Sequence, residues 1–71
     1  MRVHGIIPQP TGDPRIFTLP SPPTPSESLI LFRNGILQQP GEEFDLNGTE
    51  IKFSFEPAAD DWMRCWYEAE N

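Results

Sequence analysis

Cysteine and histidine are almost missing from this chain of 71 residues, which removes two common stabilisers of small domains. The single cysteine, Cys65, cannot form an internal disulfide. The single histidine, His4, lies near the other end of the chain, and a Cys/His zinc site normally takes four ligands. A core of this size rarely supplies more than about 3–5 kcal/mol by itself. We therefore expect the protein to gain stability by association, with itself or with a larger body.

Basic residues and long apolar runs are also few. The chain has 5 basic residues against 11 acidic ones, for a formal net charge of −6. The cations are scattered at Arg2, Arg15, Arg33, Lys52 and Arg64. They form no basic stripe of the kind that binds nucleic acid. No apolar run reaches membrane-spanning length, and the first residues lack the apolar stretch of a signal peptide. We expect neither nucleic acid nor a membrane as a partner, and synthesis in a cytoplasm.

No group of residues resembles a catalytic or cofactor site. The acidic pairs Glu42-Glu43 and Asp60-Asp61 fall in expected turns as solvated carboxylates, whereas acid–base catalysis needs two carboxyl groups in contrasting environments. Cys65 lies in an apolar strand segment, which favours a buried, inert thiol. Glycine-rich phosphate loops are absent. We predict that the chain is not an enzyme and binds no cofactor or metal.

Proline, by contrast, is abundant in the first part of the chain. Seven of the residues from 8 to 25 are prolines, and each fixes its own φ and lacks an amide donor, which argues against a helix or a central strand. Residues 15–19 interrupt this pattern with a β-prone run, which we predict to be a short edge strand. We therefore predict an extended arm over residues 1–27. The arm is either a rigid connector or a segment that lies across a neighbour.

Two Asn-Gly pairs, at residues 34–35 and 47–48, punctuate the rest of the chain. Asn-Gly is the strongest short signal for a β-hairpin, because a type I′ turn needs positive φ at both central residues. Around the second pair apolar and polar residues alternate with a period of two, which places one set of side chains on a core. That apolar set is Phe44, Leu46, Ile51, Phe53 and Phe55.

The remaining strands follow from similar runs. Residues 28–33 are almost continuously apolar, which favours a central strand covered on both faces. Residues 36–39 and 61–68 supply a short strand after the first turn and a last strand. Residues 28–71 are thus predicted to form an antiparallel β core. The fold class expected for the whole chain is all-β, a small antiparallel β-sandwich or meander of about five to six short strands.

The last strand carries apolar or aromatic side chains on both of its faces. One face presents Met63, Cys65 and Tyr67, and the other presents Trp62, Arg64 and Trp66. Trp, Tyr and Arg are enriched at protein–protein hot spots, and an arginine between two indoles can stack on them. Three interpretations remain open for the second face: a core covered by the N-terminal arm, a protein interface, or a platform that stacks carbohydrate rings.

The order of the motifs resembles a small β-sandwich module of tailed-bacteriophage virion proteins. The matching motifs are Phe-Thr-Leu-Pro at residues 17–20, the segment 29–35 ending in Asn-Gly, Gly41 with Phe44, the segment 48–53, Pro-Ala-Ala-Asp at 57–60, and Tyr67. The resemblance covers residues 15–67. The chain departs from the module's usual pattern in two places: Asp60-Asp61 follows alanine where the module commonly has Gly-Asp, and the last strand is more aromatic. The second departure points to a specific docking face on this copy.

The resemblance implies a structural role in a virion. As a stand-alone copy of the module, the chain looks like a capsid decoration (cement) protein that binds across neighbouring major capsid subunits and stabilises the shell, as a trimer or dimer. The expected location is the virion, at the capsid surface rather than the tail. The alternatives are a neck or tail adaptor or fibre-attachment protein and, second, a carbohydrate-binding module. The expected partner-binding residues are Trp62, Arg64 and Trp66, with Arg15 and Phe17 on the arm.

Overall fold

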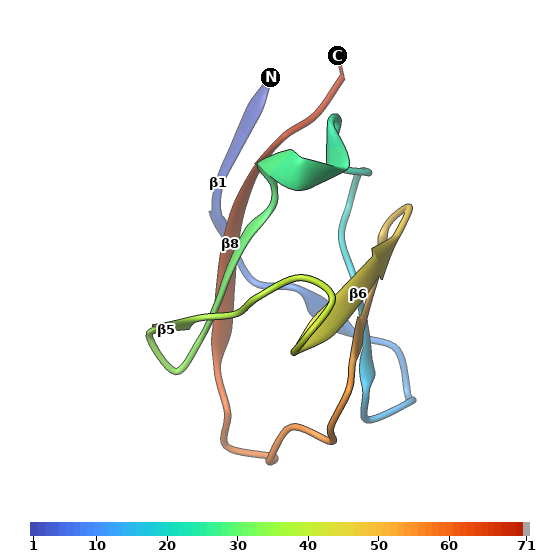
Figure 1. Ribbon diagram of the computed structural model, residues 1–71, viewed down its shortest axis with the longest axis vertical. Coiled ribbons are helices and arrows are strands. Elements are labelled where there is room, and N and C mark those ends of the chain that lie inside the picture. Colours follow the sequence, from blue (N-terminus) through green and yellow to red (C-terminus); the bar gives the residue numbers. More distant parts are fainter. Residues whose placement is uncertain (71) are drawn as a thin grey trace.

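The computed structural model describes residues 1–70 as a sandwich of two antiparallel sheets with four strands each (Figure 1). Sheet A has the strand order β1-β8-β4-β5, and sheet B has the order β2-β3-β7-β6. The strands of sheet A are β1 (Arg2–Ile6), β8 (Met63–Glu68), β4 (Ile30–Arg33) and β5 (Ile36–Leu37). Those of sheet B are β2 (Gln9–Pro10), β3 (Ile16–Thr18), β7 (Glu50–Phe53) and β6 (Phe44–Asn47). The predicted all-β antiparallel fold is confirmed.

The N-terminal segment belongs to the sandwich and is not a separate arm, so the predicted division at residue 27 is wrong. β1 pairs with β8 in sheet A, and β2 pairs with β3 in sheet B. β3 was expected at an edge, but it lies between β2 and β7. The prolines of the N-terminal segment permit this strand pairing because they stand between strands or in the edge strand β2. In an edge strand, a proline whose nitrogen faces away from the neighbouring strand removes no hydrogen bond of the sheet. These added strands raise the count above the expected five to six.

The proline-rich stretch after β3 closes one end of the sandwich. The amide of Thr24 donates to the carbonyl of Glu68 at 2.7 Å, and the amide of Glu68 donates to Ser28 Oγ at 3.0 Å. A short 3₁₀ turn, η1 (Ser26–Ser28), follows the prolines and leads into β4 (Figure 1). Within residues 1–70 no helix is long and apolar enough to cross a membrane.

The core lies between the two sheets and is built by the alternation that the sequence displays. In β8, Cys65 is buried as predicted, and Met63 and Tyr67 on the same face are buried with it. From sheet B, Ile51 and Phe53 of β7 face them and are also fully buried. The remaining buried apolar residues are Leu19, Leu29, Leu31, Phe44 and Ala69. The period of two therefore correctly separated the two faces of β7 and β8, and in β7 it also identified the apolar inner face.

The two Asn-Gly pairs form turns of different kinds. Asn34 (φ 54°) and Gly35 (φ 81°) both have positive φ, as a type I′ turn requires, and they join β4 to β5. In the second hairpin Asn47 belongs to β6 and pairs with Glu50, so the central residues are Gly48 and Thr49. Gly48 (φ 62°) then occupies the first central position, where type II′ turns place glycine. The hairpin was predicted, but its turn is shifted by one residue.

Candidate interaction surface

The outer face of sheet A carries a group of apolar side chains around one arginine. Ile30 lies opposite Trp66 and Phe32 lies opposite both Arg64 and Leu37, and directly opposite residues share a face. We call this surface the tryptophan face; its residues are Ile30, Phe32, Leu37, Arg64 and Trp66, together with Trp62 immediately before β8. Trp62 is 54% exposed, and Ile30 and Leu37 are 43% and 47% exposed. The surface is therefore both apolar and open to solvent.

Trp66 is held in place by an irregularity in β1. The register of β1 on β8 shifts between Val3 and Ile6, which leaves His4 and Gly5 together opposite Trp66. Gly5 has a φ of +54°, a conformation that only glycine adopts without strain and that is typical of one class of β-bulge. A Cβ atom added at Gly5 would lie 3.6 Å from Cζ2 of Trp66. The indole therefore packs directly on the backbone of the bulge.

Phe32 holds Trp66 from the other side. The two ring centroids lie 5.7 Å apart with an interplanar angle of 87°, an edge-to-face arrangement worth about 0.5–1.5 kcal/mol beyond the buried area. Together with Gly35 and Trp62, these rings and Arg64 line a shallow hollow on the surface. The side chain of Arg64 is exposed and makes no ion pair within residues 1–70. The face thus offers an unneutralised guanidinium among fixed aromatic rings.

Trp62 is positioned by the turn between β4 and β5. Its amide donates to Oδ1 of Asn34 at 2.9 Å, and the amide of Asn34 donates to the carbonyl of Trp62 at 2.8 Å. The Asn34 side chain also donates from Nδ2 to Oδ1 of Asp61 at 2.8 Å. The exposed indole therefore projects from a backbone that is anchored on both sides.

Asp61 is a structural residue, contrary to the expectation of a solvated loop carboxylate. Its side chain is 10% exposed, and Oδ2 accepts hydrogen bonds from Nη1 of Arg33 at 2.8 Å and from the amide of Ala58 at 3.0 Å. The hydrogen bond from Asn34, with smaller contributions from Ala58 and Arg33, lowers the pKa of Asp61. The Arg33 guanidinium also lies 4.7 Å from the ring centroid of Phe55. This group ties the connection before β8 to sheet A.

The expected binding residues Arg15 and Phe17 do not belong to the tryptophan face. Phe17 lies on the interior strand β3, and its ring packs edge-to-face on Phe53 at 5.7 Å, so most of it serves the core. Its remaining exposed part lines a lateral hollow that also includes Trp62 and Arg64. Arg15 is exposed just before β3, where its carbonyl accepts the amide of Phe53 at 2.9 Å.

Sequence reasoning missed three members of the tryptophan face: Ile30, Phe32 and Leu37. The apolar run at residues 28–33 predicted a strand covered on both faces, but nothing within residues 1–70 covers the outer side of β4, where Ile30 is exposed. The available signal was the matching run in the last strand, because two neighbouring strands that are apolar on both sides produce one continuous apolar outer face.

The other chemically reactive groups offer no second site. Cys65 is fully buried, and burial raises the pKa of its thiol to about 11, which makes it a poor nucleophile. Within residues 1–70 no three histidine, cysteine or acidic side chains gather in a way that could hold a metal ion.

Comparison of the chain with protein-family models, with curated proteins and with solved structures found no match. Any functional assignment must therefore come from the geometry of the surface and from the motifs of the sequence.

Proposed function

We propose that this chain is a protein-interaction module that docks on a larger protein through the tryptophan face. The observation that carries the proposal is the combination of exposed Trp62, Ile30 and Leu37 with Arg64, which makes no ion pair within residues 1–70, on one sheet face. Contiguous exposed apolar groups mark interaction sites, and Trp and Arg are the residue types that dominate binding hot spots. The packed side chain of Trp66 also loses little conformational entropy on binding.

The partner surface that fits this face is apolar and carries a carboxylate. Burial of Arg64 in a dry interface is unfavourable unless the partner supplies a counter-charge. A second copy does not offer one readily, because the carboxylate of Glu68 on the same face of β8 already pairs with Arg2. Docking on a different protein therefore satisfies the charges of this face better than face-to-face self-association.

The motif resemblance supports a place for this module in the virion of a tailed phage. Our first proposal is capsid decoration, in which the chain binds across neighbouring major capsid subunits and stabilises the shell, as a dimer or trimer. A neck or tail adaptor is the alternative. Copy number separates the two roles, and quantitative mass spectrometry of purified virions measures it. Hundreds of copies per particle support decoration, and about a dozen support the adaptor.

The direct test is binding to virions of the phage whose genome encodes the chain, after the protein has been removed from them. Trp62→Ala is the main variant, because Trp62 is exposed and its removal leaves the core intact. A hot-spot loss of about 2 kcal/mol weakens co-sedimentation about 30-fold. Arg64→Gln is expected to weaken it as well, and Lys52→Gln on the exposed surface of sheet B is the matched control.

Two outcomes would contradict the proposal. Folded Trp62→Ala and Arg64→Gln variants that bind like the wild type would remove the tryptophan face as the docking surface. Saturable binding on a glycan array that Trp62→Ala abolishes would favour the carbohydrate-binding alternative. The geometry gives that alternative less support, because the indole of Trp66 already contacts Gly5 and Phe32.

A further inference from the structure

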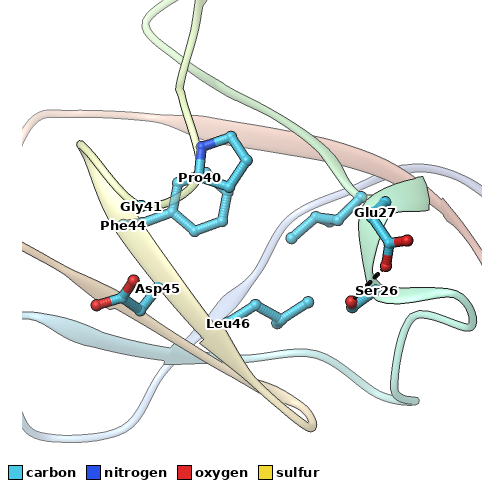
Figure 2. A pocket seen from close by; sticks show the side chains of 8 residues that line it. Ser26, Glu27, Pro40, Gly41, Phe44, Asp45 and Leu46 are labelled. Carbon is cyan, nitrogen blue, oxygen red and sulfur yellow. Dashed lines mark hydrogen bonds between the residues drawn. The ribbon is translucent and has the colours of Figure 1, made fainter.

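A second candidate surface lies along the free edge of sheet B, away from the tryptophan face. A cavity of about 270 Å³ separates β6 from η1 (Figure 2). Leu29, Phe44 and Leu46 give it an apolar lining, and Pro40 and Gly41 border one end. Figure 2 shows the side chain of Leu46 pointing from β6 towards η1, with Glu27 across the cavity and Asp45 on the other side of β6.

Within residues 1–70, part of the outer edge of β6 has no hydrogen-bond partner beside this cavity. β6 is the last strand of sheet B, and only alternate residues direct their amide and carbonyl groups towards β7. Phe44 and Leu46 direct theirs to the open side: the carbonyl of Phe44 accepts the amide of Gly41 at 2.7 Å. Leu46 has no backbone partner among residues 1–70. Within residues 1–70, the chain therefore supplies a backbone partner for Phe44 on this edge and none for Leu46.

We propose that β6 accepts an extended segment of a partner protein as an added strand at Leu46. In an antiparallel pairing, one residue of the segment exchanges two hydrogen bonds with Leu46 and directs its own side chain into the cavity. Addition of a peptide strand to a sheet edge is a recurrent recognition mode, in which main-chain bonds supply affinity and side-chain pockets supply specificity. The cavity lies below the range of about 300–1,000 Å³ found for small-molecule sites, so it takes one apolar side chain.

The charges near the cavity indicate which residues should flank the inserted apolar residue of the partner segment. Glu27 lies across the cavity, Asp45 projects from the other side of β6, and no basic residue lines the cavity. Lys52 lies opposite Asp45 on β7, makes no ion pair within residues 1–70, and does not line the cavity. The neighbours of the inserted residue point to the outer side of the sheet, where one of them lies next to Asp45. The segment that fits best is therefore an apolar residue flanked by lysine or arginine.

The test is a titration of the ¹⁵N-labelled protein, followed by NMR, with an end-capped peptide of sequence Thr-Lys-Leu-Lys-Thr. Variants of the peptide carry Ala, Val or Phe at the centre, glutamates in place of both lysines, or an N-methyl group on the central residue. Saturable shifts are expected at Leu46, Asp45 and Glu27, together with slower hydrogen exchange of the Leu46 amide. The acidic and N-methylated peptides are expected to bind at least about tenfold more weakly.

Charge-reversed variants of the protein test the same contacts from the other side of the complex. The double variant Glu27→Lys with Asp45→Lys should weaken binding of the basic peptide at least about tenfold through like-charge contacts. Glu50→Lys, an exposed position of β7 that does not line the cavity, is the matched control and should change it little. The proposal is wrong if none of the basic peptides protects the Leu46 amide, or if the N-methylated peptide binds equally well. Shifts centred on Trp62 and Trp66 would also overturn it, and would favour the tryptophan face instead.

Discussion

The two outer faces of the sandwich are built on the same pattern and have opposite compositions. Both sheets alternate inward and outward residues, and both inner faces are apolar. The outward residues of β6 and β7 are Asp45, Asn47, Glu50 and Lys52, an ordinary solvated surface. The outward residues of β4 and β8 include Ile30, Phe32, Arg64 and Trp66. Alternation therefore separates the inward from the outward side chains of each sheet. The composition of the outward side chains then distinguishes an ordinary solvated face from a candidate interface.

The two faces also differ in how firmly their side chains are held. On sheet A, the Gly5 bulge and Phe32 fix Trp66, and Asn34 and Asp61 fix the backbone that presents Trp62. Within residues 1–70 no ion pair fixes Lys52 or Asp45 on sheet B. Preorganised side chains are what a binding surface needs, because their ordering entropy has been lost during folding.

The largest expected effect concerns the thiol of Cys65, which reports whether the inner side of sheet A is closed to solvent. With a pKa raised from 9.0 to about 11, the native thiol has roughly a hundredfold less thiolate than a free one at pH 8. We expect a disulfide reagent to react with Cys65 only at the rate of unfolding. Stopped-flow measurements with and without urea check this expectation. Rapid reaction of the native protein would contradict the closed core.

The second largest effect compares how much one side chain from each outer face contributes to the free energy of unfolding. Trp66→Ala removes a half-buried ring from Phe32 and Gly5, and we expect a loss of about 2–3 kcal/mol in the free energy of unfolding, below the about 3–5 kcal/mol of a fully buried aromatic residue. Lys52→Ala on sheet B is the control and should change it by no more than about 0.5 kcal/mol. Urea denaturation measures both. Equal effects would remove the distinction between a fixed and a solvated face.

The smallest effect is the contribution of Asp61 to acid stability. Since folding lowers the pKa of Asp61 below its ordinary 3.8, its stabilising contribution is present above pH 3.8 and is lost as the pH falls through the lower, folded-state value. Asp61→Asn should therefore be less stable than the wild type at pH 7, and the difference should shrink below about pH 4. Urea midpoints between pH 2 and 7 test this, with Asp45→Asn on sheet B as the control. A difference that does not vary with pH would show that Asp61 does not act through its charge.

Much of the fold and part of the candidate surface could be predicted from local patterns. Alternation in residues 61–68 separated Met63 and Cys65 from Trp62 and Arg64, and the structure buries the first pair and exposes the second, whose exposure the sequence had left open. The same pattern did not show that most of the Phe17 ring packs in the core, because a period of two identifies two faces without saying which one is covered. It also missed the role of Asp61, whose partners on the β4–β5 turn lie far from it in the sequence.

The sequence by itself determined the class of fold, the hairpins and the two faces of each strand, because turn chemistry and side-chain alternation act between neighbours along the chain. Only the tertiary structure decided that the proline-rich N-terminal segment joins both sheets, that β4 and β8 combine their outer residues into one surface, and that β6 keeps an open edge at Leu46. These three features depend on strand pairing between distant segments. Local preferences do not encode that pairing, because its free energy comes from burying the apolar faces of strands from both ends of the chain against one another.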